Sequence, residues 1–328
     1  MDSSIVTARA HANIALAKYW GKASVQHNMP AVPSISVTLE ALSTTTSVAF
    51  DDDLTHDDVL ANGVHQSEEF RERVCTLLDR VRKEASIFAR ARVVSSNDFP
   101  TASGLASSAS AFAALALASV KAAKLPWDAE KISDLARQSS ASAARSVFGG
   151  FVRLAAGNAS KTFLAAEPIA PADYWDLRVV VAIVSEKPKT VGSTRGMIHT
   201  QTTSPYFDAW CALCPALASR VELAIAQRDL DMLGQALEQS AFAMHASAMA
   251  SDPGVVYFEP ATIAALQCIR AMRGDGVPAY ATMDAGPHVK VVTSSFYASE
   301  VLHRLQAVPG VCRTIVSGLG GPAEVLSG

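Results

Sequence analysis

The sequence has no excess of positive charge. Its 328 residues include 28 Lys and Arg against 31 Asp and Glu, which gives a formal net charge of -3. Proteins that bind nucleic acids or anionic membrane surfaces need a concentrated excess of basic residues. We therefore expect neither nucleic acid nor a membrane as a partner, and an anionic ligand has to be bound at a local site.

Cysteine is scarce, and the number is odd. The five residues are Cys75, Cys211, Cys214, Cys268 and Cys312, and the N-terminal segment lacks the basic start and apolar block of a signal peptide. A reducing, cytoplasmic location is the expectation. Cys211 and Cys214 form a C-x-x-C inside a helix-like run, without the second pair of a zinc site or the strand that precedes a thioredoxin motif. We interpret this pair as structural.

Several common catalytic motifs are missing. The one Gly-Lys dipeptide, Gly21-Lys22, is followed by Ala23, so there is no P-loop. The G-x-G-x-x-A spacing at residues 274–279 contains a proline and follows a helical pattern, which makes a dinucleotide site a poor interpretation. The sequence also has no H-E-x-x-H, no tight histidine cluster and no G-x-S-x-G.

The residues that are present predict alternating strands and helices around a large core. Hydrophobic residues make up 49% of the chain, which is ample for burial. Residues 5–50 have the alternation of strands, and helical patterns cover 66–90, 105–124 and 127–138. The run LRVVVAIVSE is the clearest buried strand, and the closing section has the strand, helix, strand order of an α/β sandwich. We expect two lobes, residues 1–185 and 186–328.

The segment NDFPTASGLASSASAFAALALA, residues 97–118, has no charged side chain after Asp98. A membrane span needs about 20 strongly apolar residues, whereas alanine and serine dominate here and Pro100 lies near its start. From Phe112 onward a core helix is expected. Its beginning is a glycine- and serine-rich loop that leads into a helix, and such an end attracts phosphate. The serines are equally compatible with simple small-residue packing.

Two further segments concentrate polar groups. NIALAKYWGK places Lys18, Tyr19 and Lys22 together, either as an exposed basic strand end or as groups that converge on phosphates. In SSASAARSVFGG, Arg145 is alone among small residues, and a buried cation needs a partner. Either an internal carboxylate or an anionic ligand satisfies that need.

Asp284 stands at the end of a β-like run, in TMDAGPHVKV, directly before a turn formed by glycine and proline. An aspartate in this position commonly caps a turn. Its alternative role is a carboxylate that points from a rigid strand end into a cleft.

Taken in order, the segments NIALAKYWGK, PSISVTL, NDFPTASGLASSASAFAALA, SSASAARSVFGGFV, STRGM and DAGPHVKV carry a resemblance. The chain resembles the mevalonate diphosphate decarboxylase family of the GHMP kinase superfamily, from about residue 8 to residue 325. This resemblance implies an α+β, two-lobed GHMP kinase-like fold with the active site in the cleft between the lobes, and a homodimer.

The resemblance also implies a reaction. ATP phosphorylates the 3-hydroxyl of mevalonate 5-diphosphate, phosphate then leaves and CO2 is lost, which yields isopentenyl diphosphate in the mevalonate pathway. ATP and Mg²⁺ are the implied cofactors, with the metal bridged by ATP phosphates and not bound by a protein motif. Alternatives within the superfamily are a mevalonate 5-phosphate decarboxylase or a mevalonate 3-kinase. A catalytically silent phosphate-binding relative is the alternative from another class.

Residue roles follow from the matched motifs. Asp284 matches the aspartate that orients or deprotonates the 3-hydroxyl, Lys18 the lysine that stabilises negative charge, and Asn13 an active-site asparagine. The implied substrate-binding residues are Tyr19, Lys22, Ser140, Ser142, Arg145 and Ser193. The implied ATP-binding residues are Ser103, Gly104, Ser107 and Ser108.

The chain departs from the family pattern at three positions. Ser139 and Ala141 stand where the family usually has glycines, so the added Cβ atoms either narrow the pocket or fix other backbone angles. His288 stands where asparagine is usual and introduces a group whose ordinary pKa lies near neutral. These departures bear on the phosphorylation state of the substrate.

Overall fold

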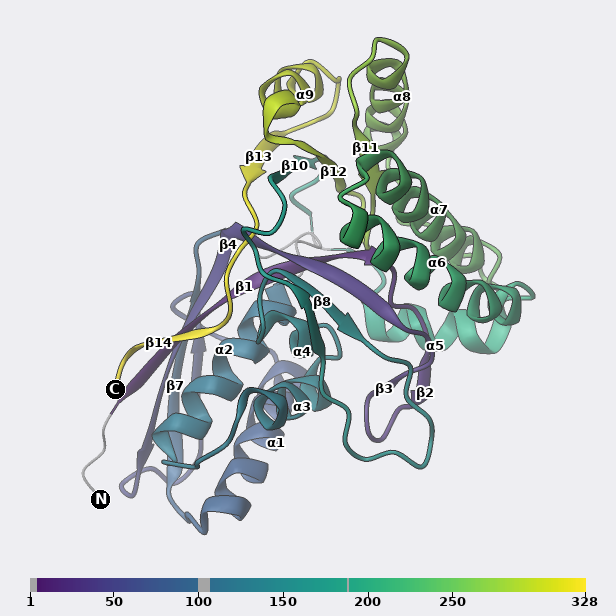
Figure 1. Cartoon of the computed structure of the whole chain (residues 1–328). Helices are drawn as coiled ribbons and strands as arrows, with labels where there is room; N and C mark the ends of the chain where they lie inside the picture. Colours follow the sequence, from purple (N-terminus) through teal and green to yellow (C-terminus); the bar gives the residue numbers. More distant parts are fainter. Residues whose placement is uncertain (1–4, 100–106, 188) are drawn as a thin grey trace.

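The computed structural model describes residues 5–99, 107–187 and 189–328. Its first layer is an eight-stranded sheet built on a long antiparallel pair, β1 and β4 (Figure 1). The strand order is β14-β1-β4-β7-β5-β6, and β8 pairs with β4 and β9. The strands are β1 (Val6–Ala17), β4 (Ser34–Asp51), β5 (Asp58–Ala61), β6 (Val64–His65), β7 (Arg90–Asn97), β8 (Phe151–Leu154), β9 (Glu167–Ala170) and β14 (Glu324–Ser327).

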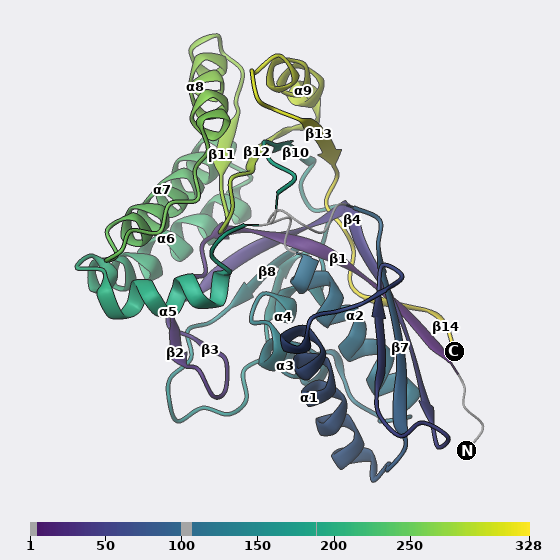
Figure 2. The ribbon, with the colours of Figure 1, turned by 180° about the vertical axis from the view of Figure 1, so that it is seen from behind.

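β1 changes character along its length. From Val6 to His11 buried and half-buried residues alternate, as expected where one face of a sheet is covered, whereas every residue from Ala12 to Ala17 is buried. Helices α2 (Ser107–Ala122) and α4 (Ala143–Ser146) contact β1, and so do α6 (Phe207–Gln227) and α7 (Leu230–Met249). Helices of both groups therefore contact β1 (Figure 2).

The helices fall into two groups. α1 (Glu68–Ala85), α2 (Ser107–Ala122), α3 (Ala129–Ser139) and α4 (Ala143–Ser146) lie beside the first sheet. Phe112, Leu115 and Val120 of α2 are buried in the core of that lobe, which confirms the expected core helix. The second group consists of α5 (Ser193–Thr203), α6 (Phe207–Gln227), α7 (Leu230–Met249), α8 (Pro260–Gly274), the 3-10 turn η1 (Ser295–Tyr297) and α9 (Ala298–Gln306).

A four-stranded antiparallel sheet accompanies the second group of helices. Its order is β11-β12-β10-β13, formed by β10 (Leu177–Ile183), β11 (Tyr280–Thr282), β12 (Val289–Ser294) and β13 (Arg313–Ser317). This sheet begins with β10, before residue 185, and the last strand, β14, returns to the first sheet. The division at residue 185 stays a prediction. A small hairpin, β2 (Lys22–Ser24) and β3 (Met29–Pro30), follows β1.

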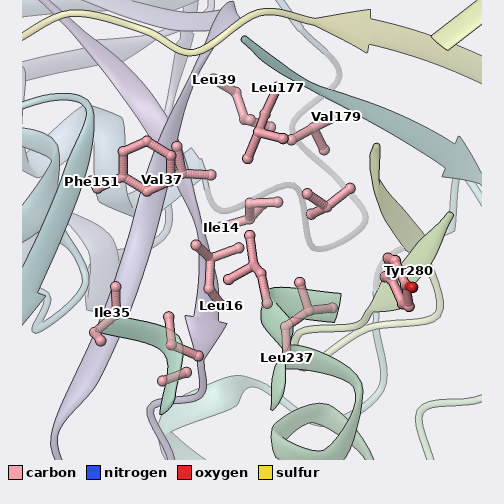
Figure 3. Close-up of a cluster of buried hydrophobic side chains, with 14 of the residues drawn as sticks. Ile14, Leu16, Ile35, Val37, Leu39, Phe151, Leu177, Val179, Leu237 and Tyr280 are labelled. Atoms are coloured by element: carbon pink, nitrogen blue, oxygen red, sulfur yellow. The ribbon is translucent and has the colours of Figure 1, made fainter. Parts of the chain in front are cut away.

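The two sheets share one hydrophobic cluster. Figure 3 shows Ile14 and Leu16 of β1 beside Leu177 and Val179 of β10, with Leu237 of α7 nearby, and all of these are buried. Because protein interiors are close-packed, this shared core fixes the end of β1 against the second lobe.

α6 is, among the helices that the structure describes, the one long and apolar enough to cross a membrane. It contains Pro215, and its buried residues Leu217, Val221 and Ile225 recur at intervals of four and face the interior. α6 packs on α7, β1 and β4. We therefore interpret it as a core helix. Cys211 and Cys214 lie within it as free thiols.

Candidate active site

A cavity of about 670 Å³ lies where the two lobes meet. Eleven of the thirteen residues singled out from the sequence line it: Asn13, Lys18, Tyr19, Lys22, Ser107, Ser108, Ser140, Ser142, Arg145, Ser193 and Asp284. The other two, Ser103 and Gly104, lie outside the described residues. Segments separated by more than 250 residues in the sequence thus meet at one site.

Asp284 lies in the loop after β11, between two ammonium groups. Lys18 Nζ donates to Asp284 Oδ1 at 2.6 Å, and Lys290 Nζ lies 3.2 Å from Asp284 Oδ2. Burial by itself would raise the pKa of Asp284, but the two lysines outweigh it and hold that pKa well below its ordinary value. The carboxylate is therefore ionised at neutral pH.

Lys18 is almost completely buried, with 2% exposure. Burial lowers the pKa of Lys18 to about 8, although Asp284 opposes the shift. Its backbone N–H donates to Ser240 Oγ of α7 at 2.9 Å, which joins the end of β1 to the second lobe. The ammonium group is thus held rigidly beside the carboxylate.

Arg145 is buried to 1% exposure without an ion pair. Its Nε donates to Ser36 Oγ at 2.8 Å and its Nη1 to Ser34 Oγ at 2.6 Å, while Asn13 Oδ1 lies 3.4 Å from Nη2. In the described part of the chain no carboxylate lies within 4.0 Å of this guanidinium. Burial lowers the pKa of Arg145 to about 10, although the charge of Asp284, beyond ion-pair distance, opposes the shift. The structure thus favours an anionic ligand over an internal carboxylate as its partner.

Asn13 connects this arginine to the loop that follows α3. Its Nδ2 donates to the backbone oxygen of Ser142 at 2.9 Å and to Ser146 Oγ at 2.7 Å. The hydroxyl groups of Ser140 and Ser142 lie 3.2 Å apart. Asn13 therefore orders the serine segment and the guanidinium together.

A second positive region surrounds Lys22, which is 8% exposed. Its Nζ donates to Asn28 Oδ1 at 2.5 Å, and Asn28 in turn donates to the backbone oxygen of Arg137 at 2.6 Å. Burial, and then the charge of Arg73, lower the pKa of Lys22 to about 8. Tyr19 Oη, also at the cavity, is buried with no hydrogen-bond partner among the described residues. The region has positive charge and an unsatisfied hydroxyl.

Besides Arg195 of α5, which lines the cavity, three cationic residues at the site were not identified from the sequence. Arg73 of α1 lines the cavity and donates to the backbone oxygen of Ser139 at 2.7 Å. Lys189 lines it too, and its Nζ donates to Ser193 Oγ at 2.8 Å. Lys290 is the third. Arg73 and Lys189 sit in charged or polar segments that give no signal, but a lysine within the apolar strand HVKVV is a signal that sequence reasoning can use.

Ser107 and Ser108 are the first two residues of α2 and line the cavity. The first N–H groups of a helix have no partner within the helix, and its N-terminus favours negative charge. This arrangement suits a phosphate.

The three departures from the family pattern have local explanations. Ser139 and Ala141 both line the cavity, and neither has a positive φ, so their backbone angles suit any residue. His288 is fully buried, and its Nδ1 accepts from the N–H of Val184 at 3.3 Å. Burial lowers the pKa of His288 to about 3. The pKa of this histidine therefore lies well below its ordinary value.

A second hollow, of about 620 Å³, lies on the second lobe around Arg273 and Tyr280. Here Arg273 is paired with Glu238 at 2.9 Å, and Tyr280 Oη donates to Asp231 Oδ1 at 2.6 Å. Because these groups already have charged partners, this hollow makes no comparable demand for an anion.

Comparison with known proteins adds an independent finding. Residues 10–165 match the diphosphomevalonate decarboxylase-like N-terminal domain, and residues 179–317 match the mevalonate 5-diphosphate decarboxylase C-terminal domain. The chain is 33% identical to the diphosphomevalonate decarboxylase of Candida albicans, across 99% of this chain and 98% of that protein. It is 34% identical to the phosphomevalonate decarboxylase of Haloferax volcanii, across 98% and 97% of the two chains.

A solved structure shows the same fold. MDDEF, in complex with MVAPP, AMPPCP and magnesium, aligns with a TM-score of 0.92 at 36% identity, and the alignment covers 99% of both chains. Overall identity is nearly equal for the two kinds of decarboxylase. The choice between their substrates therefore has to be made from the residues of the site.

Proposed function

The chain belongs to the diphosphomevalonate decarboxylase family and has the GHMP kinase fold, and from this premise we propose its reaction. The enzyme converts mevalonate 5-diphosphate and ATP into isopentenyl diphosphate, CO2, ADP and phosphate. This is an ATP-dependent decarboxylation within the mevalonate pathway, and it takes place in the cavity between the lobes.

One observation carries the proposal: the cavity holds buried cations, Arg145 and Lys22, that form no ion pair with a carboxylate among the described residues. Arg145 and Lys22 have only neutral hydrogen-bond partners among the described residues. Burying such charges is costly unless an anion completes them. A substrate with a carboxylate and a diphosphate supplies that anion, and two separate cationic regions suit a polyanion better than a monoanion.

We assign the chemical step to Asp284 and Lys18. The ionised Asp284 accepts a hydrogen bond from the 3-hydroxyl, which orients the oxygen for attack on the terminal phosphorus of ATP. The new O–P bond forms as the bond to ADP breaks, and the hydroxyl proton leaves through Asp284. Lys18 stabilises the negative charge that develops beside it.

Phosphorylation turns the tertiary hydroxyl into a leaving group. Phosphate departs with the C3–O bonding pair, and positive charge builds on the tertiary carbon. The C1–C2 bond then breaks, its electron pair forms the C2=C3 double bond, and CO2 is released. We assign the anionic ends of the substrate to Tyr19, Lys22, Ser140, Ser142, Arg145 and Ser193.

The residues at the start of α2 fit the phosphates of ATP. Ser107 and Ser108 offer hydroxyl groups and helix N–H groups, and Lys189 adds positive charge across the cavity. Magnesium, when bound with the nucleotide, neutralises phosphate charge. We assign the metal to the phosphate oxygens of the nucleotide, as the resemblance to the family implies.

The test is an assay of the purified protein with ATP and Mg²⁺ on mevalonate, its 5-phosphate and its 5-diphosphate in parallel. ADP and CO2 are measured together. Equal amounts of both with the diphosphate are expected. A preference for the 5-phosphate would assign the chain the activity for which the Haloferax volcanii relative is named, and ADP without CO2 would indicate a 3-kinase.

We also propose a cytoplasmic homodimer. The free state of all five cysteines supports a reducing compartment. The homodimer is the assembly that the resemblance to the family implies. Light scattering should give twice the 34.5 kDa of one chain, and a monomer would contradict the dimer. Cell fractionation tests the location.

A further inference from the structure

A second lysine reaches Asp284 from the interior of the four-stranded sheet. Lys290 belongs to β12 and is 1% exposed, and its Nζ lies 3.2 Å from Asp284 Oδ2. Lys18 contacts the other oxygen, Oδ1, at 2.6 Å. Each oxygen of the carboxylate thus faces its own ammonium group, and neither the motifs nor the proposed roles give Lys290 a function.

The position of Lys290 is unusual for a charged side chain. β12 lies between β11 and β10, and Lys290 is in register with Thr282 on one side and Val181 on the other. Its neighbours Val289 and Val291 are completely buried in the core of this lobe. A buried lysine is rare unless it is paired, and an apolar residue would be the more stable choice here. The contact with Asp284 supplies a reason for the lysine.

Resting on the function proposed above, we propose that Lys290 is a positioning residue for the reaction. It holds the Asp284 carboxylate in one orientation and keeps it ionised, so that Asp284 presents a hydrogen-bond acceptor to the substrate hydroxyl. A carboxylate offers about four acceptor sites. Two ammonium groups therefore leave acceptor capacity for the substrate.

Other groups around Asp284 limit the size of the effect. Its pKa is lowered by both lysines, although burial opposes them. The charged or titratable groups that face it from the surrounding elements are Lys18, Lys189, Lys290, Arg145 and His245. His245 is neutral, because burial lowers its pKa to about 3. Three cations thus remain when Lys290 is replaced, and the change in the pKa of Asp284 is partial.

The test compares Lys290→Met and Lys290→Arg with the wild type, and Lys121→Met, at an exposed position of α2, is the control. With mevalonate 5-diphosphate, the methionine variant should lose about 10- to 100-fold in kcat, with KM changed less than about threefold. Removing a cation raises the pKa of Asp284, so activity should fail on the acid side about 1–3 pH units higher. In Lys290→Arg the acid limb, which is the low-pH side of the profile of activity against pH, should stay where it is in the wild type.

The outcomes separate positioning from simple structural support. An unchanged acid limb, with kcat lost only in proportion to a lower Tm, would overturn the proposal, and so would a raised KM at normal kcat. If the methionine variant does not fold, Lys290→Gln replaces it: the glutamine variant should raise the acid limb and the arginine variant should not. Equal limbs in these two variants would overturn the proposal.

A readout without turnover keeps this inference apart from the proposed function. Carbon-13 titration of the Asp284 carboxyl group, assigned with Asp284→Asn, reports its pKa in the wild type and in Lys290→Met. The same upward shift is expected there. If the wild type releases no CO2, the proposed function fails, but the pKa shift still tests whether Lys290 positions Asp284. An unchanged pKa of Asp284 in Lys290→Met would overturn the role of Lys290 alone.

Discussion

Arg137 and Arg145 are both buried, at 0% and 1% exposure, in the α3–α4 region, but their partners differ. Arg137 Nη2 pairs with Asp134 Oδ1 at 2.7 Å, and the guanidinium also donates to the backbone oxygens of Thr162 and Leu164. Arg145 has only hydroxyl and amide partners in the described structure. Burial alone therefore does not identify a functional cation; the absence of a charged partner beside a cavity does.

The same difference separates the two ends of the cavity. Around Asp284 the charged groups are paired inside the protein, one carboxylate with two ammonium groups, and this geometry exists before any ligand binds. Arg145 and Lys22 form no ion pair among the described residues, so an anionic ligand can neutralise their charge. One end is thus prepared for chemistry and the other for binding, and substitutions should affect different quantities at the two ends.

The largest effect is expected at the paired arginine. Arg137→Met leaves Asp134 buried without its partner, which should cost about 3–5 kcal/mol in the free energy of unfolding. Urea denaturation measures this loss. A change under about 1 kcal/mol would show that the ion pair with Asp134 does not decide the stability of this region.

Asp284→Asn removes the negative charge at the Asp284 end of the cavity and keeps the shape of the side chain. Turnover should fall by about 10² or more, the scale of a lost acid/base group, while the affinity for mevalonate 5-diphosphate changes much less. Steady-state kinetics separates the two parameters. Turnover close to that of the wild type would contradict the role of Asp284.

The binding end should respond to alkaline pH. The pKa of Lys22 is lowered to about 8, chiefly by burial, so above that pH the free enzyme loses a positive charge and binds the polyanion less well. We expect kcat/KM to fall by up to about tenfold per pH unit above pH 8. Lys22→Arg should reduce this dependence, because a guanidinium stays protonated. Lys18, with a pKa also lowered to about 8, contributes any limb that remains.

The smallest effect is expected on stability at the unpaired arginine. Arg145→Met removes a buried charge that forms no ion pair among the described residues, so the free energy of unfolding of the free protein should change by less than about 1 kcal/mol. Urea denaturation beside Arg137→Met gives a matched pair of buried arginines. A loss as large as that of Arg137→Met would place Arg145 among the structural residues.

The sequence predicted which residues line the site better than it predicted which residues they contact there. Lys18, Arg145 and Asp284 lie in distinctive motifs, and the structure brings them to one cavity. Whether Arg145 has a carboxylate partner was undecidable, because its contacts Ser34 and Ser36 are 111 and 109 residues away in the sequence. Such long-range contacts leave no local pattern to read.

The fold shows the same limits. The helix from Phe112 onward was predictable because its apolar residues recur at helical spacing. The pairing of β14 with β1 in the first sheet was not predictable, because the residue pattern of a strand does not indicate which strand it pairs with. The pKa of His288 also depends on burial between distant elements, and the ordinary value was misleading.

The most direct test of the central claim is calorimetric titration of mevalonate 5-diphosphate into the wild type and Arg145→Met. The uncompensated charge predicts tight binding to the wild type and a dissociation constant at least about tenfold weaker in the variant, the scale of one charge-assisted contact. Inorganic sulfate should compete with binding to the wild type. Equal dissociation constants for the two proteins would contradict the claim that Arg145 binds the anionic substrate.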